Sequence, residues 1–411
     1  MTIRRRDFLR AAGSIPLSAG FLGSGIAAAA AAESLSSAFS FAEDRVPMNA
    51  ANLCPMPTAI GDAVARFSGE LATDMSGPNR RRIEAHKEAA RDGIAAALNV
   101  ASDEIAIVRN TSEANNVVVQ GISLTADDEV LLWDQNHPSN GVAWAVRARR
   151  SGCKVRHFSI PTDANSVDEV VDAMLGALGA RTRVVSFTHV SNVTGFRLPV
   201  QEVCAALRRK REELHIHVDG AQTWGVIDID LQATDCDSFS GSAHKWYMGP
   251  REVGMLYVRA ERQDTIWPQV VSIPWGSDAE PSVAGARRFE ALGQRDDAAI
   301  AGLAETVTFH REITPAGVER RASDVADRLR EALVEIDAPL LSTTNPLFTS
   351  NVIILKAPAE NRPQLLENVL RDGGVILAGV NGLRLSPHLY NTEEHVERVS
   401  AAIDQSRTLL G

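Results

Sequence analysis

The sequence predicts an α/β fold with a mostly parallel sheet covered by helices on both faces, followed by a smaller C-terminal α+β domain. Apolar strand segments alternate with helical segments between residues 104 and 258, and this alternation is typical of parallel sheets. Polar clusters follow several strands, as expected where ligands bind at the carboxyl ends of such a sheet. Beyond about residue 300, long helical stretches and short apolar segments replace the alternation, which indicates a second domain.

The first 32 residues are predicted to be a twin-arginine export signal that is not part of the fold. Residues 5–10 read Arg-Arg-Asp-Phe-Leu-Arg, and a weakly apolar stretch rich in Ala and Gly ends at Ala32. Several glycines and Pro16 interrupt that stretch, which favours a cleaved signal over a membrane helix. We therefore expect a periplasmic or exported protein that folds in the cytoplasm first. Because this route carries folded proteins, it also favours a cofactor bound before export.

Residues 33–75 are predicted to be an extended N-terminal segment. Pro47, Pro55 and Pro57 are expected to prevent a long helix, because proline lacks the N–H that a helix interior requires. A helix is then expected over residues 83–98, where apolar side chains recur near one face.

The large domain is predicted over residues 76–297. Its segments are short apolar strands that alternate with helices of 3.6-residue periodicity. The expected strands are 104–108, 129–133, 154–160, 183–188, 215–218, 237–240 and 254–258. The expected helices between them are 112–122, 138–150, 166–178 and 199–211.

The smaller C-terminal domain is predicted over residues 298–411. The expected helices are 298–312, 318–336, 363–372 and a final helix from residue 393. Short strands are expected at 350–356, 375–378 and 383–386. This mixed order indicates an α+β arrangement.

The composition is that of an ordinary globular enzyme. The 411 residues are 45% hydrophobic and 23% charged, and the formal net charge is −10. Nucleic-acid binding needs clustered positive charge, so we expect no nucleic-acid partner. The cysteines have neither CxxC spacing nor His partners at metal-ligand intervals, so no metal site is expected and the disulfide state stays open. They are Cys54, Cys153, Cys204 and Cys236.

The polar clusters at the strand ends supply candidate binding residues. Because parallel strands end at the same edge of a sheet, these loop residues should converge on one crevice. Thr111 and Ser112 open a predicted helix, whose N-terminus suits a phosphate group, although the same atoms could simply cap the helix. The other residues of these clusters are His137, Asn192, Asp219 and Gln222.

Lys245 is the candidate centre of the chemistry. It lies in Ser-Gly-Ser-Ala-His-Lys-Trp-Tyr-Met-Gly-Pro at residues 240–250, between two predicted strands. The closing Gly-Pro places the lysine on a turn after a buried strand rather than on a solvated helix face. A desolvated lysine amine is suited to forming a Schiff base with a carbonyl group.

These motifs resemble the class V aminotransferase family, whose members are pyridoxal-phosphate (PLP) enzymes of fold type I. The resemblance runs from about residue 48 to the C-terminus and is most specific at residues 189–195, 219–222 and 242–245. It implies PLP as the cofactor, a PLP-binding large domain, and a homodimer with its sites at the interface. Lys245 is implied to be the Schiff-base lysine.

The resemblance also implies roles for the other residues of the crevice. Asp219 would face the pyridine nitrogen and keep it protonated, so that the ring can accept electrons from the substrate α-carbon. Gln222 and Asn192 would bond the ring hydroxyl. His137 would stack on the ring and assist proton transfer.

Phosphate and substrate binding are assigned by the same resemblance. The implied phosphate-binding residues are Thr111, Ser112, Ser242 and His244. Arg384 matches the arginine that binds the substrate α-carboxylate, a task suited to a bidentate guanidinium. Gln294 departs from the family, which commonly has a threonine there that reaches the phosphate of the partner subunit, and this puts the cross-subunit contact in doubt.

The implied activity is PLP chemistry through Lys245 on the α-amino group or α-carbon of an amino acid, either free or linked in a peptide. Loss of the α-proton is shared by epimerisation, transamination and β-elimination or C–S lyase chemistry, so the outcome stays open. Residues 219–225 and 384–391 look most like the isopenicillin N epimerase branch. A periplasmic enzyme that modifies a siderophore peptide and a non-catalytic PLP-binding protein are the alternatives.

A cysteine desulfurase is not expected. Such enzymes carry a nucleophilic cysteine on a loop shortly before the carboxylate-binding arginine. Here residues 379–382 read Gly-Val-Asn-Gly, and no cysteine follows Cys236.

Overall fold

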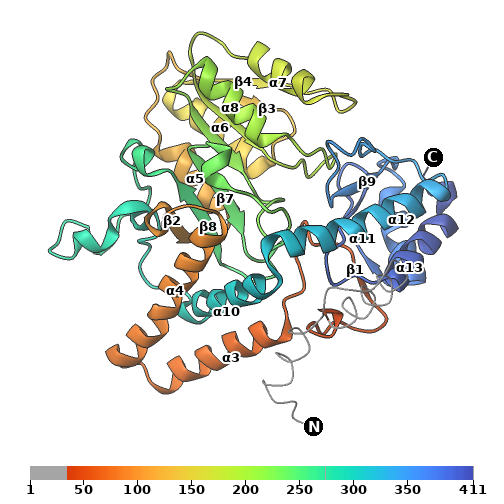
Figure 1. Cartoon of the computed structure of the whole chain (residues 1–411), viewed down its shortest axis with the longest axis horizontal. Helices are drawn as coiled ribbons and strands as arrows, with labels where there is room; N and C mark the ends of the chain where they lie inside the picture. Colours follow the sequence, from red (N-terminus) through yellow and green to blue (C-terminus); the bar gives the residue numbers. More distant parts are fainter. Residues whose placement is uncertain (1–34, 274, 411) are drawn as a thin grey trace, which may run out of the picture.

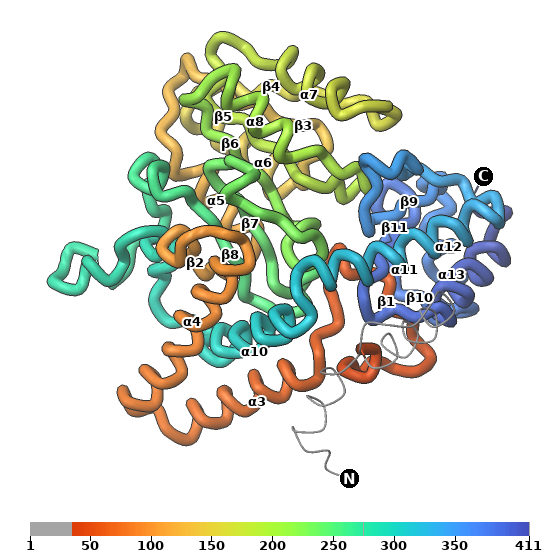
Figure 2. Tube along the Cα trace, viewed as in Figure 1, coloured from red at the N-terminus to blue at the C-terminus, as the bar shows by residue number. Residues whose placement is uncertain are grey.

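The computed structural model describes residues 35–273 and 275–410, so the export signal predicted at residues 1–32 lies outside the described residues. The chain forms a large part around a seven-stranded sheet and a smaller part that contains the C-terminal helices (Figure 1, Figure 2). The long helix α11 (Pro315–Glu335) runs from one part to the other (Figure 1).

The central sheet has the strand order β2-β8-β7-β6-β5-β3-β4. Only β8 runs antiparallel to its neighbours, β2 and β7, so the predicted mostly parallel sheet is confirmed. The strands are β2 (Ile105–Val108), β3 (Glu129–Trp133), β4 (Lys154–Phe158), β5 (Thr182–Thr188), β6 (His215–Asp219), β7 (Ser238–Ser242) and β8 (Gly254–Val258).

Helices cover both faces of this sheet because neighbouring strand residues bury apolar side chains on opposite sides. Leu131 and Val185 belong to one core, and the adjacent Leu132 and Val184 belong to the other. The first core is closed by α4 (Gly77–Ala97), α7 (Val167–Gly176), α8 (Val200–Lys210) and α10 (Asp297–Ile313). The second is closed by α5 (Thr111–Gly121), α6 (Pro138–Ser151) and the short helix η4 (Gly285–Phe289).

The smaller part has a core of its own, to which residues from both ends of the described chain contribute. Val46 and Met48 pack with apolar residues of α11, α12 (Arg362–Gly373) and α13 (Glu393–Gln405). Its strands are β1 (Val46–Pro47), β9 (Ile353–Leu355), β10 (Val375–Ile376) and β11 (Leu383–Leu385). β1 pairs in parallel with β10, and β9 pairs antiparallel to β11. The remaining short helices are η1 (Ser102–Glu104), α9 (Leu231–Thr234), η2 (Ala260–Thr265), η3 (Glu280–Val283) and η5 (Arg407–Leu409).

The expectation of a wholly extended segment over residues 33–75 is wrong, because α3 spans Thr58–Thr73. Pro57 stands directly before the first helical residue, where its missing N–H costs nothing. Ile60, Ala63 and Phe67 then recur at helical spacing and are buried, and α3 packs against α10. The prolines therefore define where this helix begins instead of preventing it.

Helix α4 also begins earlier than predicted, at Gly77. The side chain of Ser76 accepts a hydrogen bond from the amide of Asn79, and a proline lies in the first turn. Both features stabilise a helix start.

Helix α10 and Val46 pack in different parts of the molecule. The helix packs on α3 and α4 of the large part, while Val46 lies in the core of the small part. The domain boundaries drawn from the sequence stay predictions.

The described residues carry two further general features. None of their helices is long and apolar enough to cross a membrane. All four cysteines are buried and free.

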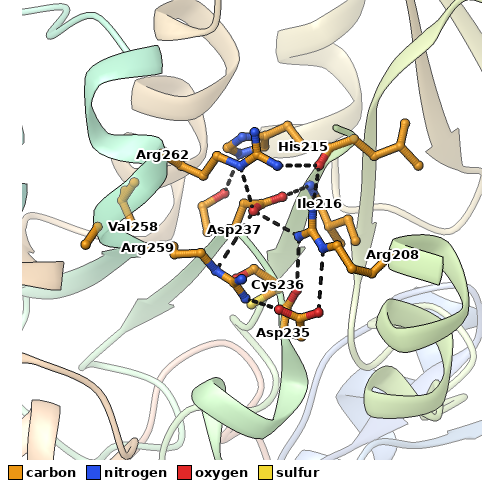
Figure 3. A network of polar contacts seen from close by, with 12 residues as sticks. Arg208, His215, Ile216, Asp235, Cys236, Asp237, Val258, Arg259 and Arg262 are labelled. Atoms are coloured by element: carbon orange, nitrogen blue, oxygen red, sulfur yellow. Dashed lines mark hydrogen bonds and ion pairs between the residues drawn. The ribbon is translucent and has the colours of Figure 1, made fainter. Parts of the chain in front are cut away.

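The buried carboxylate of Asp237 stabilises the amino-terminal end of β7, opposite the carboxyl ends of the strands, where the polar clusters lie. Asp237, just before β7, is fully buried and is approached by Arg208 at 2.9 Å and by Arg262 at 3.0 Å (Figure 3). Its second oxygen accepts a hydrogen bond from the Ile216 amide at 2.7 Å. Burial alone would raise the pKa of Asp237, but His215, the arginines and this amide together lower it. The carboxylate thus ties α8, β6 and η2 to β7.

We expect the Asp237→Asn substitution to destabilise the protein by about 3 kcal/mol, because it removes the buried carboxylate that the partly buried Arg208 and Arg262 share. The free energy of unfolding in urea measures this. Asp235→Asn, at a more exposed carboxylate of the same cluster, should cost less than about 1 kcal/mol. Because the pKa of Asp237 is lowered in the folded state, its stabilisation is present above about pH 4 and is lost as the pH falls through that lowered pKa. Equal effects of the two substitutions would contradict this role.

Candidate active site

The predicted site residues gather at the carboxyl ends of the sheet strands. Asp219 is the last residue of β6, and Ser242 is the last residue of β7. Lys245 lies in the turn between β7 and the antiparallel β8. The pKa of Lys245 responds to Asp219 and Arg384, and that of His137 responds to Lys245, Asp219 and Arg384. These four groups therefore lie close enough to act on one another.

Lys245 is held in a dry environment without a fixed partner. Its amine makes no hydrogen bond or ion pair with the residues that the structure describes. Desolvation lowers the pKa of Lys245 to about 8, while Asp219 acts in the opposite direction and Arg384 in the same direction. Near pH 7 such an amine is neutral in about one molecule in ten, far more often than an ordinary lysine, and the neutral form is the one that acts as a nucleophile or a base.

Asp219 is buried, with 1% of its surface exposed, and each carboxylate oxygen has one donor from the protein. Oδ1 accepts from the Ala221 amide at 3.0 Å, and Oδ2 accepts from Asn115 Nδ2 at 2.8 Å. Gly220 allows this arrangement, because a Cβ there would meet the Phe239 ring at 1.9 Å. Each oxygen keeps a lone pair for a further donor.

The start of α5 provides an anion-binding turn. Thr111 donates from its amide to Ser242 Oγ at 2.8 Å, and the two hydroxyls lie 2.7 Å apart. Asn110 caps the Glu113 amide, whereas the amide and hydroxyl of the exposed Ser112 make no hydrogen bond with the described residues. Free donors at a helix N-terminus suit a phosphate. The structure therefore brings Thr111 and Ser242 together beside Ser112, and phosphate binding by these residues stays a prediction.

His244 follows Ser242 by two residues and directly precedes Lys245. Desolvation, Lys245 and Arg251 lower the pKa of His244 to about 4. The imidazole is therefore neutral and can contribute one N–H. Its role in phosphate binding stays a prediction.

His137 precedes α6 and caps it. Its Nδ1 accepts a hydrogen bond from the Ser139 amide at 3.1 Å, so the proton of the neutral ring lies on Nε2. Desolvation and Lys245 lower the pKa of His137. The ring face and Nε2 remain for a ligand, and the stacking role stays a prediction.

The two amides predicted to bond the ring hydroxyl differ in what they leave free. Gln222 accepts from Trp246 Nε1 at 2.6 Å and donates to the Ala51 carbonyl at 3.1 Å, so one N–H remains. The Asn192 side chain is largely buried and makes no hydrogen bond with the described residues. Asn192 is therefore the freer of the two donors.

Arg384, on β11, is a buried cation without a carboxylate. It is 5% exposed, and among the described residues its Nε has no hydrogen-bond partner and its guanidinium bonds only Asn49 Oδ1, at 3.5 Å. Desolvation lowers the pKa of Arg384 to about 10. Leaving a guanidinium buried and unpaired is costly, which is physically reasonable where an anionic ligand completes the site.

The donor set fits pyridoxal phosphate. Lys245, whose amine has no hydrogen-bond partner among the described residues, can bind its aldehyde, the start of α5 its phosphate, and the buried carboxylate of Asp219 its ring nitrogen. When bound, PLP supplies a carbonyl carbon that lysines and amino acids attack and a ring that accepts electrons from the α-carbon. In the described residues no group of three or more His, Cys, Asp or Glu is arranged to hold a metal ion.

Some important residues were missed from the sequence. Asn115 bonds Asp219, and its Oδ1 accepts from Ser240, while Trp246 fixes Gln222. His217 and Asp219 are spaced by two on a strand, as are Ser238 and Ser240, and that spacing could have indicated a polar face. Gln294 bonds Arg80 and Asp297 in its own chain, at 3.2 Å each.

Comparison with known proteins agrees with this chemistry. Residues 55–403 match the family model described as aminotransferase class-V. Isopenicillin N epimerase of Streptomyces clavuligerus is 30% identical over 378 residues, which cover 87% of this chain and 94% of that protein. A cysteine desulfurase of Enterobacter sp. (strain 638) is 30% identical over 350 residues, which cover 79% of this chain and 83% of that protein.

A solved structure shares the fold. The cystine C–S lyase C-DES, in a variant with glycine covalently linked to PLP, superimposes with a TM-score of 0.80 at 23% identity, covering 88% of this chain and 97% of that chain. Fold-type I architecture, PLP as cofactor and an enzymatic role are therefore supported together. The chain belongs to the aminotransferase class V family.

Proposed function

We propose that this enzyme inverts the configuration at the α-carbon of an amino acid, either free or linked in a peptide, whose carboxylate binds Arg384. The observation that carries the proposal is the buried, unpaired guanidinium of Arg384, which acts on the pKa of both Lys245 and His137. A carboxylate bound there would hold its α-carbon near both groups. The printed name of the Streptomyces clavuligerus relative supports inversion as the outcome.

Two side chains can move the α-proton. Lys245, with its pKa lowered to about 8, would accept the α-proton as a neutral amine. His137, whose Nδ1 contacts Ser139, would take up a proton from solvent and return it to the α-carbon from Nε2, which leaves the ring neutral again. Inversion needs two such groups, whereas transamination and elimination need only one at the α-carbon.

The desulfurase outcome lacks its nucleophile. The segment that precedes Arg384 contains no cysteine, and the four cysteines present are all buried. Burial raises the pKa of Cys54 to about 12, and burial also raises the pKa of Cys204 and Cys236. Thiols of this kind are inert.

The substrate proposal extends to peptides. The twin-arginine pattern at residues 5–10 supports folding around the cofactor, export through the twin-arginine machinery and action in the periplasm, where a siderophore peptide is a candidate substrate. Turnover of free amino acids but not of the peptide would contradict the peptide proposal. N-terminal sequencing of protein from cell fractions would contradict export if residues 1–32 were retained.

A homodimer is part of the same proposal. The segment between β8 and α10 projects from the large part (Figure 1) and exposes Trp267 by 68%, Val271 by 62% and Ile273 by 89%. Exposed apolar residues gathered on one segment are typical of an interface. Light scattering should give a dimer, which Ile273→Asp should weaken; a monomer at micromolar concentration would contradict the proposal.

We predict that PLP adds to the apoenzyme faster as the pH rises, with a midpoint near the Lys245 pKa of about 8, because only the neutral amine attacks the aldehyde. Arg384→Gln should move the midpoint upward, since Arg384 lowers the pKa of Lys245. It should also raise the substrate KM about 10- to 100-fold. Stopped-flow absorbance and steady-state kinetics measure these changes. Arg320→Gln, at an exposed arginine of α11, is the control, and an unchanged midpoint in Arg384→Gln would contradict the prediction.

His137→Phe should separate proton removal from inversion, because phenylalanine can stack on a ring but cannot transfer a proton. In D2O, the wild type should incorporate deuterium into isopenicillin N or a free L-amino acid with mixed configuration. The variant should still exchange the α-proton but with retention. Mass spectrometry and chiral chromatography measure both outcomes.

His157→Phe, at an exposed histidine of β4, is the matched control, because it makes the same substitution outside the site, and it should behave as the wild type. Inversion by His137→Phe at an unchanged rate would show that His137 does not return the proton. Release of a keto acid or of a β-substituent by the wild type would contradict inversion as the outcome.

A further inference from the structure

A row of buried polar side chains runs along the sheet behind Asp219. His215, His217 and Asp219 alternate along β6, and Ser238 and Ser240 alternate along β7, so all five point to the face covered by α5. The strands are in register, with His217 opposite Ser238 and Asp219 opposite Ser240. Each of the five residues is at most 6% exposed.

These side chains form a continuous hydrogen-bonded chain that ends at Asp219. Asn115, from α5, donates to Asp219 Oδ2 at 2.8 Å. Asn115 Oδ1 lies 3.0 Å from His217 Nε2 and 2.7 Å from Ser240 Oγ. His217 Nδ1 lies 2.8 Å from Ser238 Oγ, which lies 3.0 Å from His215 Nε2. At its far end, His215 adjoins the Asp237 cluster (Figure 3).

The donors in this chain all point toward Asp219. A carboxylate oxygen can only accept, so Asn115 must turn its Nδ2 to Asp219 and its Oδ1 to His217 and Ser240. An amide oxygen can only accept as well, so His217 carries its proton on Nε2. Desolvation and His215 lower the pKa of His217 to about 3, and the neutral ring therefore accepts at Nδ1 from Ser238. The Ser238 hydroxyl in turn accepts from His215.

The chain controls the one side-chain donor that Asp219 has among the described residues. An asparagine amide can rotate by half a turn, which would place its oxygen against the carboxylate. His217 and Ser240 both donate a hydrogen bond to Asn115 Oδ1. In the rotated amide these two donors would face the NH2 group instead and lose their acceptor, which makes that orientation unfavourable. The orientation of Asn115, and with it that of the Asp219 carboxylate, thus depends on His217.

We propose that His217 is a positioning residue: through Asn115 it fixes the ionised Asp219 carboxylate toward the PLP ring nitrogen and so sets how strongly the cofactor accepts electrons. His217 itself touches neither cofactor nor substrate. The inference rests on PLP binding and not on which reaction follows loss of the α-proton.

The decisive experiment reads the ring nitrogen directly. Holoenzyme reconstituted with 15N-labelled PLP reports protonation of that nitrogen by its NMR chemical shift. His217→Leu removes the donor to Asn115, whereas His217→Gln retains an N–H near the position of Nε2. We expect the wild type and His217→Gln to show the protonated nitrogen, and His217→Leu to show a signal moved toward the unprotonated form.

The kinetics should divide in the same way. His217→Leu should lower kcat by about tenfold or more, a scale typical of partners that orient a ligating group, while KM changes by less than about twofold. Thr234→Val, which removes a buried hydroxyl that bonds the Asp230 carbonyl on α9, controls for the loss of a buried hydrogen bond. It should leave the 15N signal and kcat unchanged.

If His217→Leu does not fold, Ser240→Ala tests the same point, because it removes the second donor to Asn115 Oδ1. It should move the 15N signal in the same direction by a smaller amount. An unchanged 15N signal in whichever of the two variants folds would overturn the inference. A wild-type protein that binds no labelled PLP would instead overturn the cofactor assignment.

Discussion

The desolvation of two cations at one edge of the sheet is the constraint on which the site depends. Lys245 and Arg384 both lie where burial lowers the pKa, to about 8 and about 10. The carboxylate of Asp219 raises the pKa of Lys245, whereas no carboxylate of the described residues acts on the pKa of Arg384. Burying two cations costs free energy, which a rigid surrounding structure must bear and which anionic ligands reduce. A cofactor phosphate and a substrate carboxylate are the anions that this chemistry requires.

The frame is the central sheet, which holds polar groups at both ends of β6 and β7. Asp237 and its arginines fix the amino end of β7, and Asp219 lies at the carboxyl end of β6. The row of His and Ser side chains between them replaces apolar packing on that face. A fully hydrogen-bonded row of this kind rigidifies a core, and it connects the structural anchor with the catalytic edge.

The strand and helix alternation was predictable because each strand is apolar and each helix periodic, and β3 and β8 fall at the predicted residues. Helix α3 was missed because the prolines before it were given more weight than the spacing of Ile60, Ala63 and Phe67. Lys245 and Thr111 follow strands and Asp219 ends one, and all three could be found from motifs. Asn115 and His217 could not, since their roles arise from contacts between elements far apart in the sequence.

The visible absorbance of the purified holoenzyme, compared with that of Lys245→Ala, tests most directly whether Lys245 binds the cofactor. If Lys245 holds PLP covalently, the wild type shows the absorbance band of the lysine-bound cofactor, the band shifts when a substrate amino acid is added, and it is absent from Lys245→Ala reconstituted with PLP alone. The same band in Lys245→Ala, or no band in the wild type after PLP is added, would contradict the central role of Lys245.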